Sequence, residues 1–173
     1  QKELGAAILG GIAPLLERKE FEFNLVAGIR KEVAEYWTKC IEEQGLKKFL
    51  GKSVRIFSAR TKEKAFEEFE DVLRETDVLW TKPSELSFYV GLGIPLIIAP
   101  PIGSQEIQNR KWILYVGAGV DQLSPSICHQ WLPDLVRKGI LAEAAMQGFV
   151  EVEKNGVENI TKLLGQSFNT YRK

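Results

Sequence analysis

The chain has 173 residues, 45% of them hydrophobic, so it can bury a core of its own and is most simply a single domain. Its 23 basic and 23 acidic residues cancel, which argues against binding of nucleic acid or anionic membranes through bulk electrostatics. There is no apolar run long enough to span a bilayer and no recognisable signal peptide, and the two cysteines are far apart, which favours a reducing cytoplasm.

Helices and strands alternate in the first half of the predicted structure. Apolar residues recur at helical spacing over 2–19, but Gly10, Gly11 and Pro14 predict a kink or an early end near Pro14. In this half the predicted helices are 2–19, 29–45 and 61–75, and the predicted strands are 21–28, 53–59 and 77–80.

The second half continues the alternation and then becomes mostly helical. The run 95–100 is apolar throughout, which is typical of a strand covered on both faces. Ser104 is the expected N-cap of the helix that follows, and Pro133 and Gly139 are expected to interrupt the helical sequence after residue 122. The predicted helices here are 84–92, 104–117 and 155–168, and the predicted strands are 95–100 and 118–122.

This alternation predicts an α/β fold, a Rossmann-like parallel sheet with helices on both faces. Ligands of such sheets bind beyond the carboxyl ends of the strands. Two polar turns, 81–87 and 103–109, follow successive strands and open helices, so we expect them to face one edge. Free N–H groups at helix starts favour a phosphate-bearing ligand, and amide and carboxylate side chains suit sugar hydroxyls. An ordinary capped helix is the alternative for each turn.

The other candidate motifs are weak. The segment 45–53 resembles a P-loop, but it has five residues between its glycines where four are needed, and its predicted helix and strand are in the reverse order. Gly117 and Gly119 form a lone G-x-G without a third glycine. Cys128 and His129 are too few for a zinc site, and a surface histidine is the simpler interpretation. The sequence offers no self-contained catalytic constellation, and we expect no metal and no cofactor.

Three segments together carry a resemblance to a known family: TDVLWTKPSELS (76–87), GIPLIIAPPIGSQEIQN (93–109) and VGAG (116–119). With these, the chain resembles the C-terminal, donor-binding domain of a GT-B glycosyltransferase. It is most similar to monogalactosyldiacylglycerol synthase and the diacylglycerol glucosyltransferases, and more distantly to the lipid II N-acetylglucosaminyltransferase. NLVAGIRKEV (24–33) fits too, so the resemblance covers most of the chain.

The resemblance implies a site for a nucleotide sugar, expected to be a UDP-sugar, from which a hexose is transferred to an acceptor. The loop after the second strand would meet the base through backbone groups, the first turn the diphosphate and the second turn the sugar. The implied nucleotide-binding residues are Ser58, Ala59, Arg60, Lys82, Ser84, Glu85, Leu86 and Ser87. The implied sugar-binding residues are Gly103, Ser104, Gln105, Glu106 and Asn109.

The resemblance also implies that residues 1–173 are one nucleotide-sugar-binding domain of a larger two-domain protein. Its first strand lies upstream of Gln1, and its partner is an N-terminal acceptor-binding domain that supplies the catalytic base and any membrane contact. Alone, this domain is expected to be inactive, and the full protein is expected in the cytoplasm, peripheral to the membrane.

Two departures keep a second hypothesis open. The segment between Lys82 and Gly93 is about two residues shorter than in the family, and Tyr89 and Val90 stand near the position of the family's ribose-binding acid. Glu85 is acidic but lies at the other end of the helix. The alternative is therefore a degenerate GT-B-like domain that acts as a non-catalytic binding or assembly module. An unrelated Rossmann-like nucleotide binder is a third alternative, which the poor G-x-G disfavours.

Overall fold

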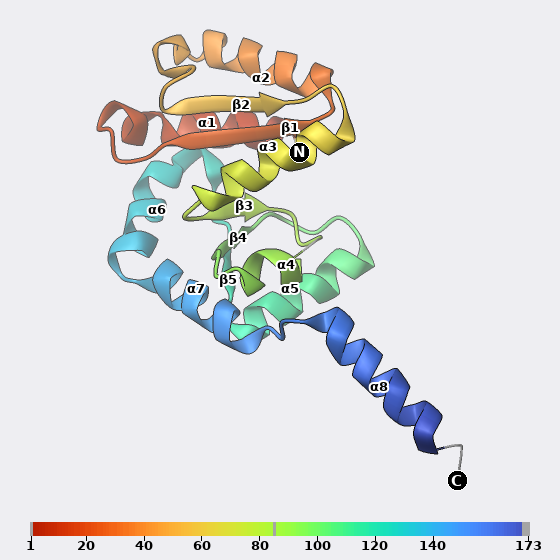
Figure 1. Ribbon diagram of the computed structural model, residues 1–173. Helices are drawn as coiled ribbons and strands as arrows, with labels where there is room; N and C mark the ends of the chain where they lie inside the picture. Colours follow the sequence, from red (N-terminus) through yellow and green to blue (C-terminus); the bar gives the residue numbers. More distant parts are fainter. Residues whose placement is uncertain (1, 85, 171–173) are drawn as a thin grey trace. The chain divides into compact units, whose positions relative to one another are not determined.

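The computed structural model describes residues 2–84 and 86–170, with side chains as far as Gly165, and is a mixed α/β structure with small parallel sheets (Figure 1). Its contacts divide the chain into two compact units. Unit 1 consists of Gln1–Asp77 and Asp121–Ile140, and unit 2 of Val78–Val120 and Leu141–Lys173. The chain therefore crosses between the units three times, after Asp77, Val120 and Ile140. The expectation that residues 1–173 form one domain stays a prediction.

Unit 1 is built around two parallel strands. Phe23 pairs with Val54 and Leu25 with Ile56, and a bulge near the end brings Gly28 opposite Ser58. Helices α1, α2 and α3 follow the expected chain order, and α2 and α3 each pack against both strands. The elements are α1 (Lys2–Glu17), β1 (Phe23–Gly28), α2 (Lys31–Glu43), η1 (Lys47–Phe49), β2 (Val54–Ser58), α3 (Lys62–Arg74), η2 (Pro125–Ile127) and α6 (Cys128–Arg137).

Helix α1 supplies much of the core of unit 1. Leu9 and Leu15 are fully buried, and the helix packs against α2, η2 and α6. The prediction of an early end near Pro14 is wrong, because α1 continues through Pro14 to Glu17. Burial of one apolar face offsets the roughly 3 kcal/mol that an internal proline costs a helix.

Unit 2 holds a three-stranded sheet in the order β3-β4-β5. Leu96, Ile97 and Ile98 are almost completely buried, as the continuous apolar run of β4 predicts. A hydrogen bond also joins β4 to the start of β5: the N–H of Leu96 donates to the carbonyl of Ala118 at 3.2 Å. The elements are β3 (Leu79–Thr81), α4 (Leu86–Gly91), β4 (Leu96–Ile98), α5 (Ser104–Val116), β5 (Gly119–Asp121), α7 (Ile140–Glu151) and α8 (Gly156–Thr170).

The backbone of β5 lies very close to β4 and α5 at Gly119. A side chain at Gly119 would put its Cβ 2.7 Å from the carbonyl oxygen of Leu96 and 3.0 Å from Cγ2 of Ile113. Only glycine therefore lets β5 come this close to β4 and α5. The G-x-G of the sequence is thus explained by packing at its second glycine, with no nucleotide required.

The predicted cap of α5 is wrong. Gly103, not Ser104, occupies the N-cap position: its backbone is extended and its carbonyl accepts a hydrogen bond from Ile107 at 3.0 Å. The Glu106 carboxylate instead holds the loop just before the helix, because it accepts the backbone N–H of Ile102 at 2.7 Å. Ser104 is then the first helical residue, and its side chain is not used as a cap.

Over the residues that the structure describes, no helix combines the length and the apolar character needed to cross a bilayer.

Candidate functional site

The two polar turns of unit 2 lie at adjacent strand ends. Strands β3 and β4 are parallel, with Thr81 opposite Ile98, and the N–H of Ala99 donates to the carbonyl of Thr81 at 2.8 Å. The chain therefore leaves both strands at the same edge, through Lys82 on one side and Pro100 on the other. This confirms the expectation that the two turns face a common edge.

Asn109 joins the two turns. Its side-chain amide, on the second turn of α5, donates to the carbonyl oxygen of Pro83 at 2.9 Å and to that of Ser84 at 3.2 Å. One amide thus satisfies two backbone acceptors of the first turn. The resemblance assigned Asn109 to sugar hydroxyls, whereas in the structure its N–H groups hold the turns together.

A second tie between the turns is an ion pair. The ammonium of Lys82 lies 3.5 Å from Oε1 of Glu106, and the two side chains are only 21% and 20% exposed. The N–H of Ile102 holds the pKa of Glu106 below its ordinary value, and Lys82 lowers this pKa further, against the opposing effect of burial. Glu106 is therefore ionised at neutral pH, and it balances the charge of the cation expected to meet a diphosphate.

The remaining polar groups of the turns are open to solvent. Ser84, Ser87, Ser104 and Gln105 are exposed, and within 2–84 and 86–170 their side chains have no hydrogen-bond partner. Gly103 is exposed as well, with no atom within 4 Å of where its Cβ would be. A ligand could thus reach three hydroxyls, one amide and the backbone of Gly103.

Two other assigned residues of the first turn are not in this exposed set. The side chain of Leu86 is 3% exposed and belongs to the core of unit 2, so any contact with a nucleotide would come from its backbone. Glu85 lies outside the described residues.

The three residues assigned to the base belong to unit 1, at the carboxyl end of β2. The N–H of Ala59 donates to the carbonyl of Gly28 at 2.9 Å, which keeps the ends of β1 and β2 side by side. Ser58 and Arg60 are exposed on either side of it. The contacts described above thus bring together the assigned residues of unit 2, while Ser58, Ala59 and Arg60 form a separate group.

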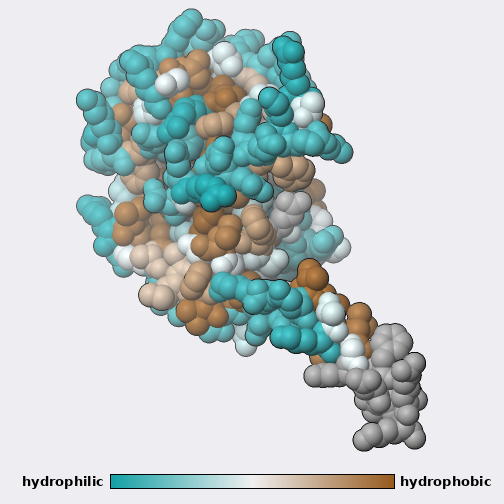
Figure 2. All heavy atoms as spheres, in the orientation of Figure 1, coloured by the Kyte–Doolittle hydropathy of each residue, from teal (hydrophilic) through white to brown (hydrophobic). Residues whose placement is uncertain are grey.

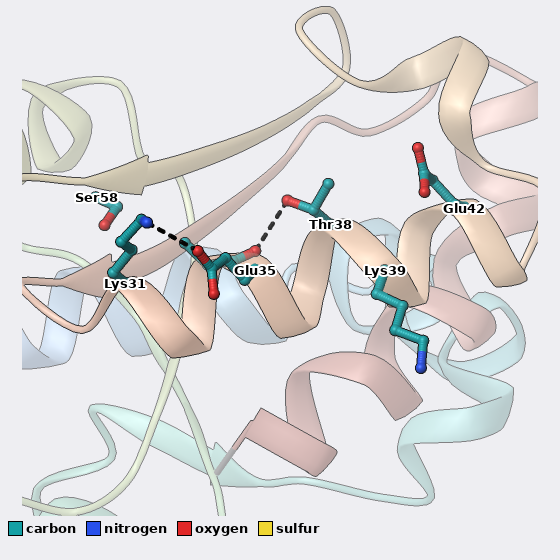
Figure 3. Close-up of a pocket in the computed structure, with 7 residues that line it drawn as sticks. Lys31, Glu35, Thr38, Lys39, Glu42 and Ser58 are labelled. Atoms are coloured by element: carbon teal, nitrogen blue, oxygen red, sulfur yellow. Dashed lines mark hydrogen bonds and ion pairs between the residues drawn. The ribbon is translucent and has the colours of Figure 1, made fainter.

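Ser58 also borders a hollow of about 450 Å³ on unit 1 (Figure 3). The hollow runs along α2, and in Figure 3 the side chain of Lys31 points toward both Ser58 and Glu35. Lys31 and Glu35 form an exposed ion pair at 3.1 Å, and Thr38 donates to the carbonyl of Ala34 at 2.9 Å. The hollow is open and lined by solvated charges, unlike the apolar clefts that usually bind small molecules.

Of the basic residues at this edge of unit 1, only Arg60 was singled out from the sequence. Arg30 and Lys31 follow β1, Arg60 and Lys62 follow β2, and all four are exposed. Acidic residues are the usual choice at helix starts, so paired cations after two strands were a signal that could have been noticed. The same helix starts also carry Glu32 and Glu63, and Lys31 is paired with Glu35, so this edge presents charges of both signs.

Cys128 and His129 both contact α1 and so contribute to the packing of unit 1. Cys128 is fully buried against α1, and burial raises the pKa of its thiol to about 11. Nδ1 of His129 lies 3.0 Å from the carbonyl oxygen of Gly11. No group of three or more metal-binding side chains occurs in the described part of the chain.

These observations define an α/β protein with two small parallel sheets and a polar edge formed by two tied turns. Residues 14–119, more than half of the chain, match the model of a family described as a domain of unknown function (DUF6938), and the chain belongs to this family. Comparison with curated proteins and with solved structures gives no significant match.

Proposed function

We propose that the edge formed by the turns 81–87 and 103–109 binds a nucleotide sugar, with the chain acting as the donor-binding domain of a GT-B hexosyltransferase. The observation that carries this proposal is the double hydrogen bond of Asn109, which holds the two turns at neighbouring strand ends. Ligands of parallel α/β sheets bind at such ends.

The exposed groups suit the two parts of the ligand differently. Ser84 and Ser87 offer hydroxyls for the diphosphate, and Ser104 and Gln105 offer a hydroxyl and an amide for the sugar. The nucleotide is UDP in this proposal, as in the resembling family. The base-binding role that the resemblance gives to Ser58–Arg60, which lie in unit 1, stays a prediction. The acceptor and the catalytic base come from an N-terminal domain of the same protein, in the cytoplasm and peripheral to the membrane.

The fold proposed for this role is Rossmann-like, the C-terminal half of a GT-B enzyme. Two βαβ arrangements support it: β1-α2-β2 and β3-α4-β4 each join parallel neighbouring strands.

A second function, a non-catalytic binding or assembly module, is favoured by one observation. Lys82, Glu106 and Asn109 already bind one another or the backbone, so three polar groups of the expected donor site are occupied. A degenerate site could keep such a structural network after losing its ligand.

Calorimetric titration of the chain with a panel of UDP- and GDP-sugars, and with free UDP, separates these functions. Gln105→Ala should weaken a UDP-sugar more than it weakens UDP, because the amide is expected to contact only the sugar. Gln130→Ala, which removes the same amide from an exposed position of α6 in unit 1, is the matched control. Absence of heat with every nucleotide sugar would refute the donor role and leave the binding module. Equal losses for UDP and the UDP-sugar would contradict the role given to Gln105.

A further inference from the structure

The connection between α7 and α8 contains an asparagine followed by glycine. Asn155 is exposed and has a positive φ of 61°, a left-handed conformation that asparagine tolerates better than most residues. Its carbonyl accepts a hydrogen bond from the N–H of Asn159 at 3.0 Å, so Asn155 stands directly before the first turn of α8. Gly156 is the first residue of the helix.

The backbone nitrogen of Gly156 is unencumbered. The first N–H groups of a helix have no acceptor within the helix, and none of the described residues accepts a hydrogen bond from this one. No atom lies within 4 Å of the position that a Cβ of Gly156 would take. The side chain of Asn155 likewise has no hydrogen-bond partner among the residues described. The Gly156 nitrogen and the side-chain amide carbon of Asn155 are therefore adjacent and exposed.

We propose that Asn155 is a site of spontaneous deamidation. The Gly156 nitrogen gives up its proton to solvent base and forms a bond to Cγ of Asn155. The bond from Cγ to the side-chain nitrogen breaks, and ammonia leaves with a proton from solvent, which closes a five-membered succinimide. Water then opens the ring at Cγ to give aspartate, or at the main-chain carbonyl to give isoaspartate. The net change is amide plus water to carboxylic acid plus ammonia, and no other reactant is needed.

The structure distinguishes Asn155 from the other asparagines whose side chains it describes. The amide of Asn109 donates to two carbonyls, and the amide of Asn159 donates to the carbonyl of Lys154 at 3.3 Å. Asn159 is also inside α8, where the next backbone N–H is committed to the helix, and Asn24 is part of β1. Each of these three is followed by a residue with a side chain, which obstructs the approach that Gly156 leaves open.

The two products act on α8 in opposite ways. Aspartate keeps a good N-cap residue and adds a negative charge at the positive end of the helix. Isoaspartate instead routes the main chain through Cβ and adds a backbone atom at the cap. This matters because α8 presents exposed apolar side chains, seen as brown surface along the helix in Figure 2, from Val157, Ile160, Leu163 and Leu164. The reaction therefore changes the helix that displays this surface.

The test is an ageing experiment on the full chain in mildly alkaline buffer, followed by tryptic digestion and fragmentation mass spectrometry. Cleavage after Lys154 and Lys162 yields one peptide that contains both Asn155 and Asn159, so each molecule carries its own control. We expect conversion to the acid at Asn155, with isoaspartate detected by an isoaspartyl methyltransferase assay, while Asn159 keeps its amide.

The Gly156→Ala variant should reduce conversion at Asn155 to the level of Asn159. Because position 156 is helical and its surroundings are empty, alanine is expected to leave the fold intact, which circular dichroism verifies. Equal conversion at the two asparagines would overturn the proposal, as would undiminished conversion in Gly156→Ala.

Discussion

The sharpest test of the packing described here uses two neighbouring glycines of α1. Gly10→Ala and Gly11→Ala make the same chemical change in the same helix, so each gains the roughly 1 kcal/mol by which alanine exceeds glycine in helix propensity. They differ in their surroundings. A Cβ on Gly10 would meet only the flexible end of Gln44, at 3.4 Å, whereas one on Gly11 would lie 2.1 Å from the carbonyl oxygen of Pro125.

The distances in the structure indicate how far the two variants should differ in stability. Ordinary contact begins near 3.4 Å, so Gly11→Ala requires the backbone of η2 to withdraw by more than an ångström, and Cys128 Sγ, at 3.0 Å, obstructs the same atom. Overpacking of this kind typically costs about 1–3 kcal/mol, which exceeds the gain in helix propensity. The net of the two effects for Gly11→Ala is therefore a loss of up to about 2 kcal/mol in the free energy of unfolding, while Gly10→Ala raises it by up to about 1 kcal/mol.

Urea denaturation followed by circular dichroism measures both values. The midpoints of the two variants should move in opposite directions from that of the wild type, with unchanged slopes. A rise in midpoint for Gly11→Ala that equals the rise for Gly10→Ala would refute the close approach of α1 to η2. A loss in both variants would show instead that α1 needs glycine at these positions for a reason other than this contact.

Two predictions concern the tied turns of unit 2. Asn109→Ala should lower the free energy of unfolding by about 1–2 kcal/mol, because two carbonyls lose their donor. Gln108→Ala, on the exposed face of the same helix, is the control and should have little effect. Equal urea midpoints for the two variants would contradict the role of Asn109 in joining the turns. The pKa of Glu106 is lowered from 4.5, so its ionised form stabilises the native state above that pH, and this stabilisation is lost as the pH falls through the lowered pKa. Glu106→Gln should thus flatten the decline of the urea midpoint below about pH 4.5, and an unchanged decline would show that this carboxylate makes no contribution.

The order of elements could be predicted well from periodicity and from glycine. The apolar run of β4 and the amphipathic pattern of α2 specify their structure locally, because buried strands and one-sided helices have distinct periods. Gly28, with a φ of 62°, ends β1 as expected. The end of α1 could not be predicted in the same way, because helix propensity at Pro14 competes with tertiary packing that only the folded unit reveals.

The pairing of the strands was harder to predict from the sequence than their positions in the chain. The alternation of strands and helices implied one sheet, whereas the described strands pair as β1-β2 and β3-β4-β5. Pairing depends on contacts between segments distant in the chain, which local patterns do not encode. The capping of α5 is a smaller case of the same kind. Ser104 and Glu106 were both visible as polar residues near the helix start, but which of them reaches a free N–H depends on where the helix begins.

The network at the two turns also changes which part of a nucleotide sugar this edge would recognise best. From the sequence alone, Lys82 looked like a free cation for a diphosphate. Because Glu106 is ionised and lies 3.5 Å away, the pair carries no net charge, and a diphosphate would have to compete with a carboxylate for it. The groups that remain free are neutral hydroxyls and the amide of Gln105, which match sugar hydroxyls more closely than phosphate oxygens. If a donor binds here, specificity should therefore reside in the second turn, and the diphosphate must draw on the backbone and serines of the first.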